Sequence, residues 1–351
     1  MERPVIVEDQ IDRLGSFLFE SKLLSSNGKV SCATCHDPER QFADGLAQSK
    51  GVMGVEVGAN SPSLVSIGTV SLFPERTEDG DFRAIGLEER CVAPIVNPLE
   101  MGSDIAPVLK KLAGDSRARR EFERALPGLP DPITEKTIGR ALAAFVRGLK
   151  PETSPYERYL GGDWGALNAT QRTGLEVFKG RGQCAVCHSG DDLSDGLVHE
   201  VSESHSPRVF ERRAKIRERV LQGLELSGKE DVDRNRRMLK LLASGYGVGG
   251  AQAQTLPLWD VTRTAPYFRD GSVAKLDAAL DTHMEELRTV PSTSPRQRVL
   301  GSRQRGRREP AEIPVALRPN RGSGQDAPRP AQLEDFERTS LLAFLATLSP
   351  E

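Results

Sequence analysis

The chain has 351 residues, of which 37% are hydrophobic and 28% are charged, and its formal net charge is −2. A chain of this length can hold two domains, and its nearly balanced charge argues against a polyanion such as nucleic acid as a partner. The sequence contains no run of about 18 apolar residues, so it predicts no membrane span.

Helical and irregular stretches alternate along the chain. Apolar residues spaced for one helix face predict helices at 9–24, 104–127, 134–149, 170–178 and 332–348. Glycine, proline and polar residues predict mostly irregular structure at 37–62, 74–86 and, with a local cluster of arginines, 291–331. The charged stretch 207–243 is predicted to be a helical insertion with a solvated face. Residues 151–164 are predicted to be a linker between two halves.

Each half contains a Cys-x-x-Cys-His motif that follows a predicted helix, which makes a weak internal repeat. The residues are Cys32, Cys35 and His36 in the first copy and Cys184, Cys187 and His188 in the second. This is the attachment motif of c-type haem, in which two thiols bond to one haem and the histidine ligates its iron. Zinc held by thiolates is the alternative, but each cysteine pair here has its own adjacent histidine. The motifs therefore predict two covalently bound haem c groups.

The haem motifs also predict the cellular compartment of the protein. No signal peptide is visible at residues 1–4, yet covalent haem attachment normally follows export. We therefore expect the chain to be the mature form of a periplasmic protein. The fifth cysteine, Cys91, has no cysteine partner and is predicted to be a buried apolar thiol.

Several further blocks follow one another in the order typical of one bacterial family. They are Leu18-Phe19, 42–45 (Phe-Ala-Asp-Gly), 60–63 (Asn-Ser-Pro-Ser), 97–102 (Asn-Pro-Leu-Glu-Met-Gly), 193–195 (Leu-Ser-Asp), 264–268 (Thr-Ala-Pro-Tyr-Phe) and 270–272 (Asp-Gly-Ser). With the haem motifs they resemble the bacterial dihaem cytochrome c peroxidase and MauG superfamily, and more closely its MauG-like group. The resemblance implies a mainly α fold of two cytochrome c-like haem domains with long loops, at 1–150 and 151–351. The insertions at 207–243 and 291–331 lie outside the pattern.

The resemblance also implies one calcium ion between the haems. By motif, this ion would be held by Asn60 and by the backbone carbonyls of Thr264 and Pro266. Amide and carbonyl oxygens with waters suit calcium, because it is a hard cation. The alternative is that both segments are ordinary turns without an ion.

The positions of the histidines limit which ligands are available on the distal side of the first haem. The sequence has five histidines, and none lies between His36 and His188. Many family members block the resting iron with such a histidine, so the resemblance implies an open N-terminal haem, as in the MauG group. Met53 and Met101 are conceivable blocking ligands, although a methionine is usually a core residue.

Glu100 matches the distal glutamate of the family in Asn-Pro-x-Glu-Met. Cleavage of the O–O bond of hydrogen peroxide needs a group that moves a proton on the distal side. The resemblance implies that Glu100 is this catalytic acid–base. The alternative is a surface or capping carboxylate.

The second haem needs a sixth ligand if it transfers electrons. One face of a predicted helix carries Leu276, Leu280, His283 and Met284. By register the family's ligand corresponds to His283, and Met284, one residue later, is also chemically suitable. A thioether ligand would give the higher potential. We expect His283, with Met284 as the alternative.

Three features depart from the family or from its usual ligands. The family usually places a tryptophan between the haems in Trp-Asp-Gly-Arg, but residues 77–81 here contain none. Trp259 is either a substitute relay, and so catalytic, or an ordinary packing residue. Arg269 replaces a family histidine and would pair with a haem propionate or face solvent. His199 and His205 are expected at the surface.

Three functions fit these features. The first is a MauG-like oxidoreductase that uses hydrogen peroxide to form a high-valent two-haem state and oxidises a partner protein, at a residue such as Trp or Tyr. The second is a cytochrome c peroxidase that reduces hydrogen peroxide to water with electrons from a small redox protein. The third is a non-enzymatic dihaem electron carrier. Glu100 and an open first haem argue against the third, and the lack of a blocking histidine favours the first.

Overall fold

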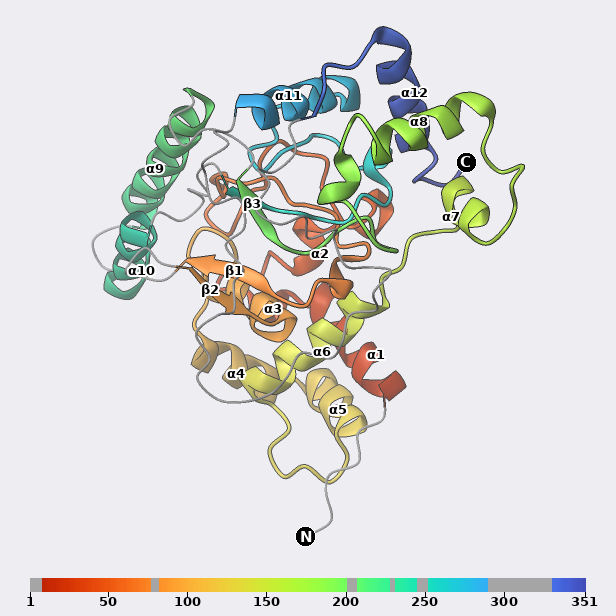
Figure 1. Cartoon of the computed structure of the whole chain (residues 1–351). Coiled ribbons are helices and arrows are strands. Elements are labelled where there is room, and N and C mark those ends of the chain that lie inside the picture. The colour runs from red at the N-terminus through yellow and green to blue at the C-terminus, as the bar shows by residue number, and fades with distance from the viewer. Residues whose placement is uncertain (1–7, 77–81, 201–206, 228–230, 245–251, 290–329) are drawn as a thin grey trace, which may run out of the picture.

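The computed structural model describes residues 8–76, 82–200, 207–227, 231–244, 252–289 and 330–351 (Figure 1). The α-helices are α1 Glu8–Glu20, α2 Cys32–Cys35, α3 Leu87–Val96, α4 Ile105–Gly114, α5 Ser116–Ala125, α6 Glu135–Gly148, α7 Pro155–Leu160, α8 Ala169–Lys179, α9 Pro207–Ser227, α10 Val232–Ser244, α11 Leu276–Thr289 and α12 Asp335–Ala346. Two antiparallel strand pairs accompany them: β1 Phe73–Arg76 with β2 Phe82–Ile85, and β3 Val198–Glu200 with β4 Gln252–Gln254. The fold is mainly α, as predicted. In the described ranges, no helix is both long and apolar enough to cross a membrane.

The helices of the N-terminal half surround one hydrophobic core, in the lower part of Figure 1. Helix α1 packs against α6 and α5, and α3 packs against α6. Leu14 of α1 and Phe122 of α5 are fully buried in this core. The helix predicted at 104–127 is two helices, because Asp115 ends α4 and its side chain caps α5 by accepting a hydrogen bond from Ala118 N at 2.8 Å.

The C-terminal half has a second hydrophobic core, in the upper part of Figure 1. Helix α8 packs against α12, and their buried residues include Phe178 and Phe344, whose rings lie 5.2 Å apart. Trp259 belongs to the same core. The stretch predicted as a linker contains α7, which adds Tyr156 to this core, so that prediction was only partly right.

The two halves use the same helix crossing. A methyl group on Gly15 of α1 would collide with the backbone carbonyl of Ala141 in α6, and one on Gly174 of α8 would collide with that of Ser340 in α12. In each half, therefore, the helix before the haem motif touches the last helix backbone to backbone. This shared contact gives a structural basis to the weak repeat in the sequence.

Two sequence expectations are wrong. Residues 74–86 were predicted to be irregular, but β1 and β2 pair there, with Phe73 opposite Ile85. Both residues are buried in a small core with helix α6, so burial on one face stabilises strands that the polar composition hides.

The charged insertion also differs from its prediction, because α9 and α10 form a helix pair with one face buried. Val220 of α9 and Met238 of α10 are fully buried against Val55 and Leu99 of the N-terminal half. Arg219 of α9 also forms an ion pair with Glu56. The segment predicted to be irregular at 291–331 lies outside the described residues up to residue 329.

Candidate functional site

The first haem motif lies on α2, a single turn that begins at Cys32 and ends at Cys35. His36 follows as the C-cap, and its Nδ1 lies 2.9 Å from the carbonyl oxygen of Phe42. A carbonyl only accepts, so Nδ1 donates the hydrogen bond and Nε2 keeps a lone pair for a metal. Burial lowers the pKa of His36, which keeps the ring neutral, as a metal ligand must be.

The second motif repeats this geometry. His188 Nδ1 donates to the carbonyl of Leu193 at 3.0 Å, and burial again lowers the pKa of the ring. The two residues that supply the carbonyls, Phe42 and Leu193, both have a left-handed backbone, with φ of 55° and 51°. Such a conformation costs about 1–2 kcal/mol for a residue with a Cβ. In each half, therefore, a residue with a strained backbone supplies the carbonyl that orients the haem histidine. Neither Phe42 nor Leu193 is a residue type that predicts a left-handed backbone.

The four motif cysteines fit haem attachment better than zinc. All are free, and burial raises the pKa of Cys32 and Cys184 to about 12 and that of Cys35 to about 11. Burial thus favours the neutral thiol at these three positions. Among the residues that the structure describes, one group of three metal-binding side chains converges, and it contains a single cysteine. The two cysteine pairs thus do not meet at one ion, and each pair with its oriented histidine fits one haem.

Glu100 lies beside the first motif, on the segment after α3. Asn97, the C-cap of α3, donates from Nδ2 to Glu100 Oε1 at 2.6 Å, and its Oδ1 accepts from Leu99 N at 3.0 Å. Burial has the largest effect on the pKa values of Cys32 and His36, and the negative charge of Glu100 raises both. The carboxylate is therefore within electrostatic reach of the first motif. The role of Asn97 as its partner was not predicted.

The helix pair α9–α10 covers this distal segment. Leu99, next to Glu100, is fully buried in the cluster that contains Val220 and Met238. The two methionines considered as blocking ligands are packing residues: Met53 lies against this same cluster, and Met101 is buried in the N-terminal core. An insertion outside the family pattern thus packs against the segment that carries Glu100.

His283 and Met284 are neighbours on α11. Burial, and after it the positive charge of His188, lowers the pKa of His283 to about 4. The ring of His283 is therefore within electrostatic reach of His188 in the second motif. Met284 is buried, and its carbonyl accepts a hydrogen bond from Arg288 Nε at 3.0 Å.

The segments expected to hold calcium meet where the two halves touch. Asn60 N donates to the carbonyl of Arg269 at 2.7 Å, three residues beyond Pro266. Asn60 Nδ2 donates to the carbonyl of Leu46 at 2.7 Å, which leaves the amide oxygen as the atom for a cation. Amide and backbone carbonyl oxygens are chemically suited to a hard cation.

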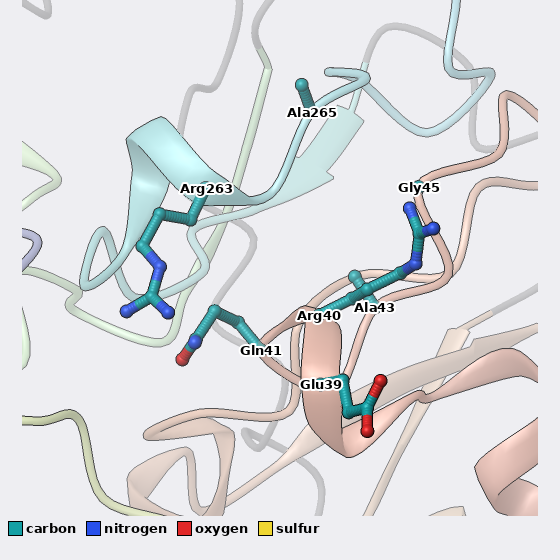
Figure 2. Close-up of a pocket in the computed structure, with 7 residues that line it drawn as sticks. All are labelled: Glu39, Arg40, Gln41, Ala43, Gly45, Arg263 and Ala265. Atoms are coloured by element: carbon teal, nitrogen blue, oxygen red, sulfur yellow. The ribbon is translucent and has the colours of Figure 1, made fainter.

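A cavity of about 150 Å³ separates the loop after the first motif from the turn at 263–265 (Figure 2). Its lining residues are Glu39, Arg40, Gln41, Ala43, Gly45, Arg263 and Ala265. Figure 2 shows the side chain of Arg263 directed toward Gln41, and that of Arg40 toward Gly45. One arginine from each half lines the cavity together with Glu39, and each arginine also pairs with a carboxylate: Arg40 with Asp37 at 3.5 Å and Arg263 with Asp260 at 3.4 Å.

Gln41 joins the two halves through this region. With its amide nitrogen 3.2 Å from Asp260 Oδ2, its amide oxygen accepts from Arg263 at 2.7 Å. Asp260 is fully buried, and burial raises its pKa, so it requires such partners. Gln41 precedes Phe42, and Asp260 follows Trp259. In this orientation of its amide, half-buried Gln41 forms a polar bridge from the loop after the first haem histidine to Asp260, the residue next to Trp259.

Trp259 is 6% exposed, and its ring lies 6.2 Å from that of Tyr156. It shares the C-terminal core with Cys184 and Leu193. This burial agrees with a packing role, and the neighbouring bridge through Asp260 is what a relay between the haems would need.

The predicted surface position of His199 is wrong. This residue of β3 is 9% exposed, and its Nε2 lies 2.7 Å from Asp195 Oδ2, eight residues after Cys187. Burial alone would lower the pKa of His199, but hydrogen bonds with Asp195 and Cys187 raise it to about 10. The i,i+4 spacing of Asp195 and His199 was a signal in the sequence. His205 and residues 77–81 lie outside the described residues.

Known proteins resemble the chain over most of its length. The family model of the di-haem cytochrome c peroxidases matches residues 9–164. The methylamine utilization protein MauG of Methylorubrum extorquens is 28% identical over 339 residues, which cover 96% of this chain and 78% of MauG. The cytochrome c551 peroxidase of Pseudomonas aeruginosa is 30% identical over 280 residues, which cover 78% of this chain and 71% of the peroxidase.

Solved structures resemble the fold as well. The crystal structure of a MauG-like protein associated with microbial copper homeostasis has a TM-score of 0.65 and 25% identity, and the match covers 100% of this chain and 94% of that chain. The relatives include both MauG proteins and cytochrome c peroxidases, so the likeness alone does not decide between these activities.

Proposed function

The chain belongs to the di-haem cytochrome c peroxidase family, and from this membership we propose that it uses hydrogen peroxide to oxidise a partner protein, in the manner of MauG. The family implies a peroxidase-type oxidoreductase with two haem c groups. The oxidised group on the partner would be a residue such as Trp or Tyr. Because covalent haem attachment follows export, we place this reaction in the periplasm.

Glu100, held by Asn97 beside the first haem motif, supports this function most directly. It provides a distal carboxylate in a chain that has no histidine between His36 and His188. The first haem would then be open to peroxide in the resting state, with no reductive activation needed to release a blocking histidine.

In this proposal, the protein's own residues transfer a proton to and from hydrogen peroxide. When bound, the haem iron supplies the site at which peroxide is reduced and the oxidising equivalents that result. Glu100 would accept a proton from the nearer oxygen of peroxide and return it to the farther oxygen, which leaves as water.

For the second haem we assign His188 as the proximal ligand and His283 as the distal one. The influence of His188 on the pKa of His283 supports this choice. Met284 remains the alternative, and it would give a haem of higher potential.

We further propose the division of labour between the halves. Residues 1–150 would hold the peroxidatic haem and residues 151–351 the electron-transfer haem, since each half has its own hydrophobic core and motif. A calcium ion held by Asn60, Thr264 and Pro266 would lie where the halves meet, as the contact between Asn60 and Arg269 suggests.

Reduction of peroxide to water with electrons from a small redox protein is the second candidate. The 30% identity with a cytochrome c551 peroxidase favours it. A non-enzymatic electron carrier would have no use for the distal carboxylate.

A single-turnover experiment separates these candidates. The protein, loaded with both haems by a cytochrome maturation system, is mixed with one equivalent of hydrogen peroxide without a reductant, and its absorption spectrum is followed. A persistent change in both haems is expected. Prompt return to the ferric spectrum together with rapid oxidation of added reduced cytochrome c would instead establish the peroxidase. The absence of any reaction with peroxide would leave the electron carrier.

A further inference from the structure

The aromatic residues that lose an electron most readily are concentrated in one place. The chain has two tryptophans and four tyrosines. Both tryptophans and two of the tyrosines form one row. The rings of Trp164 and Tyr159 are 5.2 Å apart at 87°, and those of Tyr156 and Trp259 are 6.2 Å apart at 37°. Tyr156 and Tyr159 lie three residues apart on α7, a spacing that puts them on the same helix face.

The two ends of the row differ in exposure. The ring of Trp164 meets solvent, with the residue 68% exposed, whereas Tyr156 and Trp259 are each 6% exposed. The outer end is nevertheless held in place: Tyr159 contacts the Trp164 ring edge to face, and Arg172 donates to the Trp164 carbonyl at 3.2 Å. An ordered, exposed tryptophan is the kind of residue that protein partners cover.

The inner end lies at the two haem motifs. Trp259 shares its core with Cys184 and with Leu193, whose carbonyl orients His188. The next residue, Asp260, is bridged by Gln41 to the loop that carries the first histidine. The row therefore runs from the surface to the place where the two halves join.

We propose that Trp164, Tyr159, Tyr156 and Trp259 are an electron path from the surface to the C-terminal haem, and that a redox or substrate protein delivers its electrons at Trp164. The two ring contacts, the shared face of α7 that joins them, the graded exposure and the position of both ends support this path. A surface of this kind also fits a protein donor: exposed Leu160 lies beside the tryptophan, and a loose Arg158–Asp163 pair at 3.9 Å borders it. An apolar centre with a charged rim is typical of protein interfaces.

The electron count is simple. Reduction of one hydrogen peroxide to two waters takes two electrons and two protons, and the path passes the electrons inward one at a time. The donor protein is oxidised by one electron at each passage. A tyrosine that is oxidised releases its phenolic proton to water, and water returns a proton when the next residue outward supplies an electron, so the path transfers no net proton. The path rests on the proposed function in one respect: the proposed reaction with hydrogen peroxide supplies the oxidising equivalents.

The path can be tested without peroxide. Trp164→Phe and Tyr159→Phe keep a ring in place but remove the group that can be oxidised. The dihaem protein is reduced to the ferrous state and exposed to photogenerated ruthenium(III) trisbipyridine, and haem oxidation is followed by transient absorption. We expect the rate to fall at least tenfold in each variant. Phe336→Leu, which alters an equally exposed aromatic residue on α12 (59% exposed), should leave it unchanged. Rates within threefold of wild type in both path variants would overturn the proposal.

A peroxide experiment gives an independent readout. After addition of peroxide without a reductant, peptide mass spectrometry should find oxygen added to Trp164 in the wild-type protein, and at least fivefold less in Tyr156→Phe. Equal oxidation in the two proteins would also contradict the path. The spectral reaction of the wild-type protein with peroxide reports separately on the proposed function, so the two can fail independently.

Discussion

The side-chain amide of Asn97 donates a 2.6 Å hydrogen bond to Oε1 of Glu100. Asn97 is itself held at the end of α3, where its Oδ1 accepts from Leu99 N and its own N–H bonds to the carbonyl of Ala93. The end of a helix thus positions the Glu100 carboxylate beside the first motif. Proton transfer requires such positioning, because its rate depends on the distance and alignment between the carboxylate and the proton that it moves.

Replacing Glu100 by glutamine should slow the reaction with peroxide by about 10²–10⁴-fold, since this is the usual contribution of a positioned acid–base. Both haems should stay bound and the ferric spectrum should be nearly unchanged, because glutamine preserves the shape. Stopped-flow mixing with peroxide measures the rate. Glu89→Gln, an exposed change on α3, is the control. A Glu100→Gln protein within a few-fold of wild type would leave Glu100 as a structural carboxylate.

His283→Ala should convert the second haem from low spin to high spin, because the variant loses the proposed distal ligand. Electron paramagnetic resonance of the ferric protein is the measurement, and one high-spin and one low-spin haem are expected before the change. Met284→Ala, on the next residue of α11, is the matched control and should leave the low-spin signal intact. If Met284→Ala alone removes that signal, methionine is the ligand.

Asn60→Ala should reduce the calcium bound to the purified protein, because the variant loses the amide oxygen proposed as a ligand. Atomic emission after gel filtration should find about one calcium per wild-type chain, as a single oxygen-lined site predicts. Asn27→Ala is a matched control, since Asn27 Nδ2 also donates to a distant backbone carbonyl, that of Val52, at 2.8 Å. Equal calcium content in all three proteins would rule out Asn60 as a ligand.

Gly174→Ala should lower the free energy of unfolding by about 1–3 kcal/mol, the usual effect of overpacking a tight contact. The added methyl group would collide with the Ser340 carbonyl where α8 crosses α12. Gly114→Ala is the control, because nothing lies within 4 Å of a methyl group there, and it should be neutral or stabilising by about 0.4–1 kcal/mol. Thermal and denaturant unfolding of the dihaem protein compare the two. A stable Gly174→Ala protein would mean that the helices can separate slightly without loss.

The sequence by itself determined the cofactors and most of the helices of this protein. Attachment of haem c requires two thiols and a histidine at fixed local spacing, so the motifs at Cys32 and Cys184 are complete in the sequence. The helices α1, α6, α8 and α12 are likewise visible there, because one apolar face repeats with the helical period. Glu100 could be singled out by its block of neighbours, since its local context resembles that of the family.

Only the tertiary structure decided which distant groups meet. Strands β1 and β2 were hidden by their polar composition, and the buried side of α9–α10 could not be inferred because the surface it covers lies more than a hundred residues away in the chain. The electrostatic influence of His188 on His283 and the ring contacts of Trp164 and Trp259 also depend on segments brought together by packing. Local patterns specify which residues can do chemistry, but long-range burial of apolar surface specifies which of them can do it together.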